Sequence, residues 1–404
     1  MGLKQNTWKL NQWYDQSVAG NAGYAAFSIG GLWSWGDGYR GQTSHNNQTD
    51  YSSPKQVGSA TTWADIATTT NYGGAAINTD GELWTWGING GGELGQNQAY
   101  PGLNAVSSPV QVPGTTWASR SDEEFGSDRS KIHLTGNTAA IKTDGTLWVW
   151  GYNQYGNVAN NTAGGVAYSS PVQVPGTTWK YISSAGVTMG GIKTDGTLWT
   201  WGKNSGGRMA NNAHSSNTAY SSPVQVPGTT WRTISFGAFN VFATKTDGTL
   251  WSWGYNTGGS LGQNQSQSTL GAYSSPVQIP GTNWKQGVAG TNDEAAAVKT
   301  DGTLWTWGRN EEGLLGQNQA HDARISSPAQ VPGTTWKNVE CMTNGMFGTK
   351  TDGTLWSWGS NADGALGINQ PGPTKRSSPV QIPGTTWKRV VGGKNNAFGY
   401  ATKS

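Results

Sequence analysis

Seven copies of the string Leu-Trp-x-Trp-Gly set the pattern of apolar and polar positions along the chain. The two tryptophans of each copy are two residues apart, so on a strand they point to one face, and the leucine and the intervening residue point to the other. No stretch of ten residues sustains the 3.6-residue period of an amphipathic helix. The pattern therefore predicts short strands, in copies that begin at Leu32, Leu83, Leu147, Leu198, Leu250, Leu304 and Leu355.

Two further strings accompany these copies. Thr-Asp-Gly comes just before Leu-Trp in six of the seven. It is typical of a hairpin turn in which glycine supplies a positive φ, so we interpret its aspartates as turn residues and not as catalytic acids. Variants of Ser-Ser-Pro-Val-Gln-Val-Pro-Gly-Thr-Thr-Trp follow each copy, and their prolines should flank a short Val-Gln-Val strand without interrupting it.

The spacing of the copies indicates the architecture. Their first tryptophans are 51 to 54 residues apart, except for one interval of 64. Each unit has room for about four short strands, and one unit alone cannot bury both of its faces. Neighbouring units must stack and the ring must close, so the sequence predicts an all-β, seven-bladed β-propeller.

The tryptophans fall almost entirely at repeated positions. Of the 23, 14 lie in the Leu-Trp-x-Trp-Gly copies and eight end Gly-Thr-Thr-Trp-type segments. We interpret them as packing between blades, since burying a large apolar side chain contributes about 2–3 kcal/mol; stacking on carbohydrate is the alternative. The predicted structural core comprises Trp33, Trp35, Trp84, Trp86, Trp148, Trp150, Trp199, Trp201, Trp251, Trp253, Trp305, Trp307, Trp356 and Trp358.

The half-units at the two ends predict how the ring closes. Residues 13–29 and 387–403 both resemble the first half of a blade, and a seven-bladed ring needs only one of them. We expect the C-terminal half-blade to pair with the strand at 32–35; the reverse assignment stays open. The expected organisation is an N-terminal arm, 1–12, followed by a propeller, 13–404.

These strings resemble the regulator of chromosome condensation repeat family. The family pattern is an apolar strand, Asp-Gly, a hydrophobic residue, an aromatic, x, Trp-Gly-x-Asn and then Gly-x-Leu-Gly; 247–256 with 259–262 follow it. The resemblance implies a seven-bladed propeller. The family includes nucleotide-exchange factors for a small GTPase, secreted bacterial inhibitors of β-lactamases, and virion proteins of bacteriophages. The amino-acid sequence of these repeats is most similar to that of the virion group.

Composition and motifs narrow the function further. Charged residues are 12% of the chain and the net charge is +3, which implies no nucleic-acid partner. One cysteine and four scattered histidines predict no metal site, and no apolar run is long enough to span a membrane. We expect no secretion signal, no cofactor, and no catalytic residues, because no hydrolase or metalloprotease motif occurs.

Recognition should depend on positions where the repeats differ. The residue after Trp-Gly varies and should ring one face of the disc, which makes Tyr152, Lys203, Tyr255 and Arg309 candidates. The second unit also carries a charged insert, about 119–137, and a solvated loop is the alternative interpretation of both features. The candidate docking residues of the insert are Arg120, Asp122, Glu123, Glu124 and Arg129.

Together these observations predict a non-enzymatic structural or recognition protein of a bacteriophage virion. It would serve as a capsid decoration, a fibre or a tail-associated part. Its partners would be other virion proteins and a host surface receptor or glycan. Two alternatives are a lectin-like glycan-binding propeller, and a protein inhibitor or GTPase exchange factor.

Overall fold

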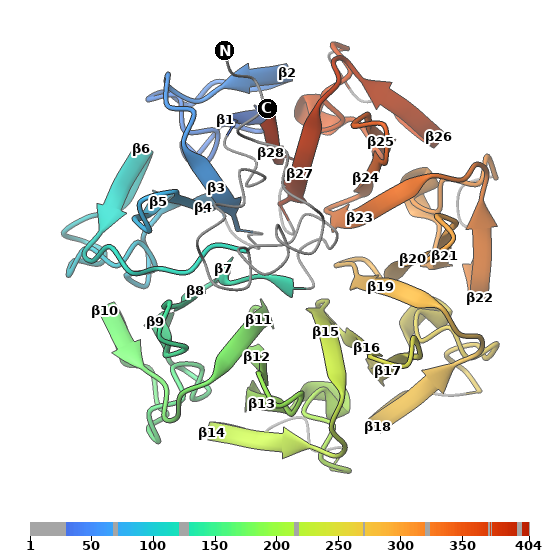
Figure 1. The fold of residues 1–404 in the computed structure, drawn as a ribbon, viewed down its shortest axis with the longest axis horizontal. Coiled ribbons are helices and arrows are strands. Elements are labelled where there is room, and N and C mark those ends of the chain that lie inside the picture. The colour runs from blue at the N-terminus through green and yellow to red at the C-terminus, as the bar shows by residue number, and fades with distance from the viewer. Residues whose placement is uncertain are drawn as a thin grey trace, which may run out of the picture.

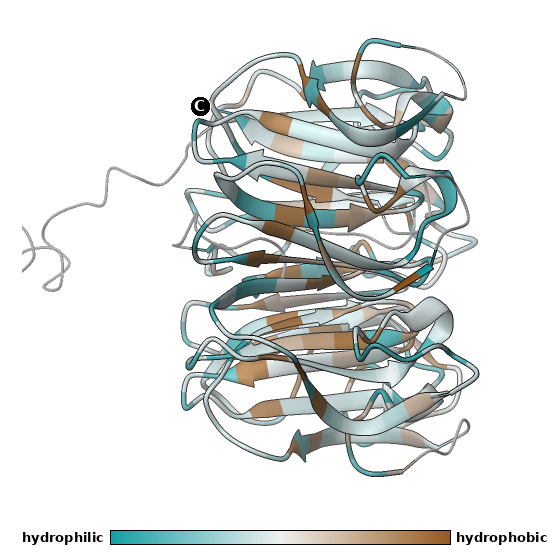
Figure 2. Cartoon of the chain, turned by 90° about the vertical axis from the view of Figure 1, so that its right-hand side faces the viewer, coloured by the Kyte–Doolittle hydropathy of each residue, from teal (hydrophilic) through white to brown (hydrophobic). Residues whose placement is uncertain are grey.

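The computed structural model describes residues 30–67, 72–120, 129–213, 218–269, 271–319, 324–370, 372, 374–393 and 398–403. Their strands form seven four-stranded antiparallel sheets arranged as blades around a central axis (Figure 1). Edge-on, the ring is a disc whose strands run from one face to the other (Figure 2). The prediction of a seven-bladed propeller is confirmed. The predicted arm 1–12 and the half-blade 13–29 lie outside the described residues.

The blades share one strand order from the axis to the rim. The innermost strands are β3 (Trp63–Ile66), β7 (Ile132–Leu134), β11 (Trp179–Ala185), β15 (Trp231–Phe236), β19 (Trp284–Ala289), β23 (Trp336–Met342) and β27 (Trp387–Gly392). The second strands are β4 (Gly73–Asn78), β8 (Asn137–Ile141), β12 (Thr188–Lys193), β16 (Asn240–Lys245), β20 (Glu294–Lys299), β24 (Gly345–Lys350) and β28 (Phe398–Lys403).

The Leu-Trp-x-Trp-Gly copies form the third strands, which are β5 (Leu83–Ile88), β9 (Leu147–Tyr152), β13 (Leu198–Lys203), β17 (Leu250–Tyr255), β21 (Leu304–Arg309), β25 (Leu355–Ser360) and β1 (Gly31–Gly36). The rim strands are β6 (Ala105–Val112), β10 (Ala167–Gln173), β14 (Ala219–Val226), β18 (Ala272–Ile279), β22 (Arg324–Val331), β26 (Lys375–Ile382) and β2 (Tyr51–Gln56). Short 3-10 turns follow four third strands, at η2 (Ser205–Gly207), η3 (Thr257–Gly259), η4 (Glu311–Gly313) and η5 (Ala362–Gly364).

We number the blades along the chain. Blade 1 holds β3–β6, blade 2 β7–β10, blade 3 β11–β14, blade 4 β15–β18, blade 5 β19–β22 and blade 6 β23–β26. The closing blade combines β27 and β28 with β1 and β2, and β28 pairs with β1 from Gly31 opposite Lys403 to Gly36 opposite Phe398. The prediction that the C-terminal half-blade closes the ring is therefore confirmed.

The rim strands differ from the prediction. Pro109 was expected to flank a strand but lies inside β6, and equivalent prolines lie inside the other rim strands. The pairing of β5 with β6 shifts its register between Thr85 and Gly87, beside this proline. A rim strand has an unpaired outer edge, so a residue without an N–H is tolerated there.

The two tryptophans of each third strand have different surroundings. The second is completely buried and donates its Nε1–H to a backbone carbonyl of the preceding blade, as Trp253 does to Arg208 O at 2.9 Å. Equivalent bonds cross every seam of the ring, from Trp35, Trp86, Trp150, Trp201, Trp307 and Trp358. A buried indole N–H needs an acceptor, so these bonds fix each blade against its neighbour.

The first tryptophan of each third strand is half-buried. It belongs to a stack of side chains at the end of the blade where the Thr-Asp-Gly turns lie. In blade 4, Lys245 Nζ lies 4.7 Å from the ring centroid of Trp231 and 4.3 Å from that of Trp251. Asp247 Oδ1 accepts the N–H and the hydroxyl of Thr249, whose oxygen accepts Trp251 Nε1–H. These hydrogen bonds lower the pKa of Asp247. The aspartates of such turns therefore hold the turn, as the sequence indicates.

Candidate functional site

One face of the disc carries the surface that is suited to recognition. It is formed by the loops after the third strands and by the turns between the two innermost strands, and we call it the WG face; the TDG face is opposite. The large hydrophobic residues that are exposed in the described part of the chain are Tyr39, Tyr100, Tyr152, Val166 and Phe239, at 44% to 66% exposure. All five belong to the WG face.

The variable residues after Trp-Gly lie on the seams of this face. The ring of Tyr152 lies so close to Gly91 of the preceding blade that a side chain at Gly91 would collide with it. Tyr255 covers Gly206 in the same way, and Lys203 Nζ lies 4.7 Å from the ring centroid of Tyr155. Arg309 borders Gly258 and pairs with Glu311. The structure thus brings the four predicted residues onto one face, where Tyr152 is 47% exposed.

A second variable set was missed by the sequence reasoning. The x position of Gly-x-Leu-Gly provides the carbonyl that accepts each seam tryptophan, and its side chain is buried in all seven repeats. These residues are Gln42, Glu93, Asn157, Arg208, Ser260, Leu314 and Ala365. The sequence does show that the x position varies within a nearly constant string. It does not show that the side chain at this position is buried, and the role of the position depends on that burial.

Two members of this set line a cavity of about 430 Å³ on the WG face. Arg208 and Asn157 share it with Tyr152, with Gly186 and Val187 of the β11–β12 turn, and with Ala238 of the β15–β16 turn. Blade 5 contributes Thr291, which lies in the β19–β20 turn. Arg208 is 4% exposed, and burial lowers the pKa of its guanidinium to about 10.

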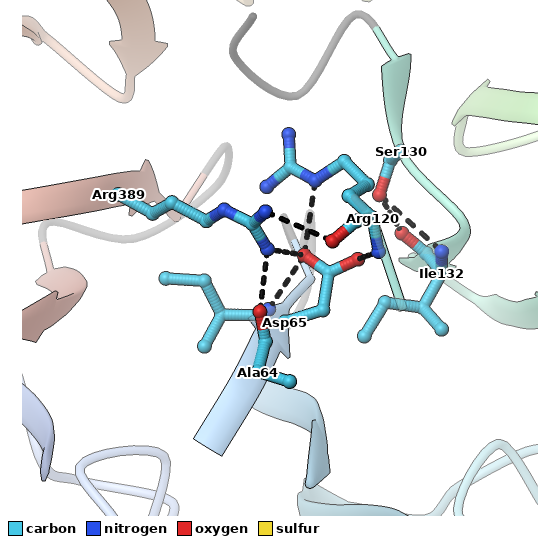
Figure 3. A network of polar contacts seen from close by, with 7 residues as sticks. Ala64, Asp65, Arg120, Ser130, Ile132 and Arg389 are labelled. Carbon is cyan, nitrogen blue, oxygen red and sulfur yellow. Dashed lines mark hydrogen bonds and ion pairs between the residues drawn. The ribbon is translucent and has the colours of Figure 1, made fainter. Parts of the chain in front are cut away.

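At the N-terminal end of the charged insert, Arg120 has a structural role. Arg120 is 2% exposed and donates Nε–H to Asp65 Oδ1 at 3.0 Å, while Arg389 Nη1 reaches the same oxygen at 3.0 Å (Figure 3). Burial alone would raise the pKa of Asp65, but the two guanidinium groups outweigh it and lower that pKa. The network joins blade 2, blade 1 and the closing blade. The prediction that Arg120 belongs to an exposed docking surface is wrong.

The other insert residues divide into two groups. Asp122, Glu123 and Glu124 lie outside the described residues. Arg129 is half-buried, with its guanidinium carbon 4.7 Å from the ring centroid of Tyr181 and its Nε–H donated to Arg232 O. The end of the predicted insert, 132–137, forms β7, the turn after it and the first residue of β8, so this part of the insert belongs to the strands of blade 2.

Two buried carboxyl groups have raised pKa values without forming a chemical site. Burial raises the pKa of Glu93 and of Glu294 to about 7. Glu93 accepts the N–H of Gly91, and Glu294 accepts those of Thr291 and Asn292. Both carboxyls therefore stabilise loops. The described residues contain no group of three or more acidic, histidine or cysteine side chains that could hold a metal, and no helix there could cross a membrane.

The closed ring of seven tryptophan-locked blades, with exposed aromatic residues and a cavity on one face, defines a β-propeller scaffold. The family model described as "Regulator of chromosome condensation (RCC1) repeat" matches residues 195–244, 247–294, 301–342 and 352–398. The chain belongs to this family of repeat propellers.

Several curated proteins are similar to the chain. It is 26% identical over 330 residues to the RCC1 domain-containing protein RUG3, mitochondrial, of Arabidopsis thaliana, an alignment that covers 76% of this chain and 68% of RUG3. It is 25% identical to the Ultraviolet-B receptor UVR8 of the same plant, over 90% of this chain and 81% of the receptor. Its 24% identity to the human E3 ubiquitin-protein ligase HERC2 spans 94% of this chain but 8% of the ligase.

Solved structures show the same fold at low sequence identity. Prp20p of Saccharomyces cerevisiae, which was studied for its binding to Gsp1p and histones, superposes with a TM-score of 0.76 at 17% identity, over 94% of this chain and 93% of Prp20p. Human WBSCR16 gives a TM-score of 0.77 at 15% identity, over 93% of this chain and 99% of the other.

Proposed function

We propose that this chain is a non-enzymatic protein-binding propeller that serves as a structural or recognition component of a bacteriophage particle. Its WG face docks to a partner protein of the particle or to a protein receptor on the host. The ring of blades supplies a rigid support for that face.

The observation that carries this proposal is the placement of the exposed apolar residues. All five large exposed hydrophobic residues of the described chain lie on the WG face, and four of them are aromatic. Aromatic side chains are enriched at protein interfaces, whereas large apolar residues gathered on one face cost solubility unless they are used. The TDG face instead presents repeated Lys–Trp stacks and Asp–Thr turns.

Two observations support placement in a virion. The repeats are nearly identical in sequence to one another and resemble the repeats of the phage members of the family. A ring that is closed by strand pairing and uses few charged residues also suits a particle component that must persist outside the cell. Binding of proteins agrees with a relative of the same fold, Prp20p, which was studied for its binding to Gsp1p and histones.

A complementation experiment tests both parts of the proposal. A phage that lacks this gene would be supplied with the wild-type chain or with Tyr39→Ser, Tyr100→Ser and Phe239→Ser combined. We expect wild-type chain in purified particles, by mass spectrometry, and at least tenfold fewer copies or infections with the triple variant. The matched control changes three TDG-face residues, Asp247→Asn and its equivalents at Asp301 and Asp352.

The outcomes separate the two parts. Absence of the wild-type chain from purified particles would overturn the virion placement. Normal incorporation and infection by the folded triple variant would overturn the role of the WG face.

A lectin-like propeller is the second candidate, because exposed tyrosine rings also stack on sugars. A glycan array separates the two, since the protein-binding proposal expects no saturable binding to any neutral or acidic glycan. The inhibitor or exchange-factor alternative predicts an effect on a β-lactamase or on nucleotide release from a small GTPase.

A further inference from the structure

The cavity on the WG face has the chemistry of a site for an anionic group with an apolar body. Its walls come from four successive blades, 2 to 5. About 430 Å³ lies near the small end of the range for ligand pockets in proteins, which is about 300–1,000 Å³. The space accepts one amino-acid side chain together with a charged group.

Arg208 supplies a buried cation that has no counter-ion in the described chain. Its Nη1 donates to Ala238 O at 2.8 Å and its Nε to Ser205 O at 3.3 Å, which fixes the guanidinium between blades 3 and 4. The described residues place no carboxylate within ion-pair distance of it and no acceptor on Nη2. A buried charge without a partner is costly, so an arriving anion gains from its presence.

Two further residues of the cavity wall carry hydrogen-bond donors without a partner in the described chain. Asn157 Nδ2 and Thr291 Oγ1 are buried and form no hydrogen bond with the described residues. Asn157 is oriented by its other amide atom, because Oδ1 accepts the N–H of Tyr155 at 3.2 Å. A carboxylate has two oxygens and about four lone pairs, so after accepting from the guanidinium it still has acceptor capacity for further donors of the cavity.

Apart from Asn137 and Gln154, the remaining side chains of the walls are mainly apolar. Ala185, Val187 and Ala238 line the cavity together with the half-exposed ring of Tyr152. A bare anion would leave these walls unused, and an internal acidic side chain would bring only a short stem. The last residue of a polypeptide carries a carboxylate and an apolar side chain on one Cα, and it can enter end-on.

We propose that the Arg208 cavity captures the C-terminal carboxylate of a partner polypeptide whose last side chain is apolar. The proposal rests on the protein-binding function proposed above and names the group of the partner that is recognised. It also explains why one x position holds arginine. The equivalent seam positions hold Gln42, Glu93, Asn157, Ser260, Leu314 and Ala365.

The test uses N-acetyl-L-leucine and its uncharged amide as probes of the full chain, titrated by ligand-observed NMR. We expect the acid to bind at least tenfold more tightly than the amide. Arg208→Leu should reduce binding of the acid at least tenfold, and it should fold because Leu314 occupies the same place in another blade. Thr291→Val, which keeps the shape of the side chain, should weaken binding about threefold and serves if Arg208→Leu melts early. The control, Arg309→Leu, removes an arginine of the same face that already pairs with Glu311 and should bind as the wild type does.

Equal binding of acid and amide would overturn the proposal, as would unchanged binding by folded Arg208→Leu. Tighter binding of N-acetylneuraminic acid than of N-acetyl-L-leucine would assign the cavity to an acidic sugar and overturn it as well. Incorporation into particles is measured separately from ligand binding, by the complementation experiment described above. A chain that binds N-acetyl-L-leucine through Arg208 but is absent from particles would refute the virion placement alone.

Discussion

Replacing Asp65 by asparagine should destabilise the ring where it closes. The change keeps the shape of the side chain but removes the charge that holds Arg120 and Arg389, whose side chains are 2% and 4% exposed. Removing one partner of a buried ion pair costs about 3–5 kcal/mol, because the other charge stays buried. An unfolding entropy of about 2.1 cal/mol/K per residue gives about 0.85 kcal/mol/K for this chain, so Tm should fall by about 4–6 °C.

Differential scanning calorimetry at pH 7 measures this loss. The matched control is Asp301→Asn on the TDG face, where the exposed carboxylate only holds Thr303 and asparagine can hold it too; we expect a change below about 1 °C. Adding Arg389→Met to Asp65→Asn removes one of the two buried guanidinium groups and should recover part of the lost Tm.

The pH dependence supplies a second signature. The pKa of Asp65 is lowered in the folded protein, so its contribution is present above the pKa of the unfolded chain and disappears as the pH falls through the folded value. The Tm difference between wild type and Asp65→Asn should therefore shrink in acid. A Tm for Asp65→Asn within 1 °C of wild type at pH 7, or a double variant less stable than the single one, would refute the reasoning.

Three further predictions concern closure, a defective repeat and pH. A chain without 387–404 should lose its cooperative melting transition, and a synthetic peptide of those residues should restore it, because β27 and β28 join the ring without a covalent link to β1; an unchanged melting curve for the shortened chain would contradict this. In blade 1, Asn78 and Glu82 stand where blades 2 to 6 have lysine and threonine, so Trp84 Nε1 is buried without an acceptor and the stack has no lysine. The double change Asn78→Lys and Glu82→Thr should therefore raise the free energy of unfolding by about 1–2 kcal/mol; a lower Tm would count against the repeat interpretation. Burial raises the pKa of Glu294 to about 7, so stability should decrease by on the order of 3 kcal/mol as the pH rises from 4.5 to 7, and Glu294→Gln should flatten that profile in urea titrations; an equally steep profile in the variant would disprove the assignment.

The sequence predicted what repetition encodes. The strands and the seam contacts recur in all seven units, so Trp253 and its equivalents could be assigned to the packing between blades from the sequence alone. Counting half-blades predicted that one of the two terminal half-units closes the ring; 387–403 was the expected one, and the pairing of β28 with β1 decided between them. The difference in burial between Trp251 and Trp253 was not predicted, since two residues on one face of a strand look alike in a sequence.

What is unique to one blade was harder to predict. Arg120 was assigned to an exposed surface because it lies in a charged cluster, but its partners Asp65 and Arg389 are 55 and 269 residues away along the chain. Arg208 was missed because its importance depends on burial at a seam and on the absence of a nearby carboxylate in the described chain. Both are properties of the folded ring.

The pairing of β28 with β1 affects how the chain is made. On the ribosome, β1 emerges before every complete blade, yet its inner neighbour, β28, is synthesised only after blade 6. Until then β1 keeps an open edge, which is a template for pairing with another molecule. The ring can therefore close only after translation of all its strands. Exchange of the closing strands between crowded nascent chains is the misfolding route that this order of synthesis favours.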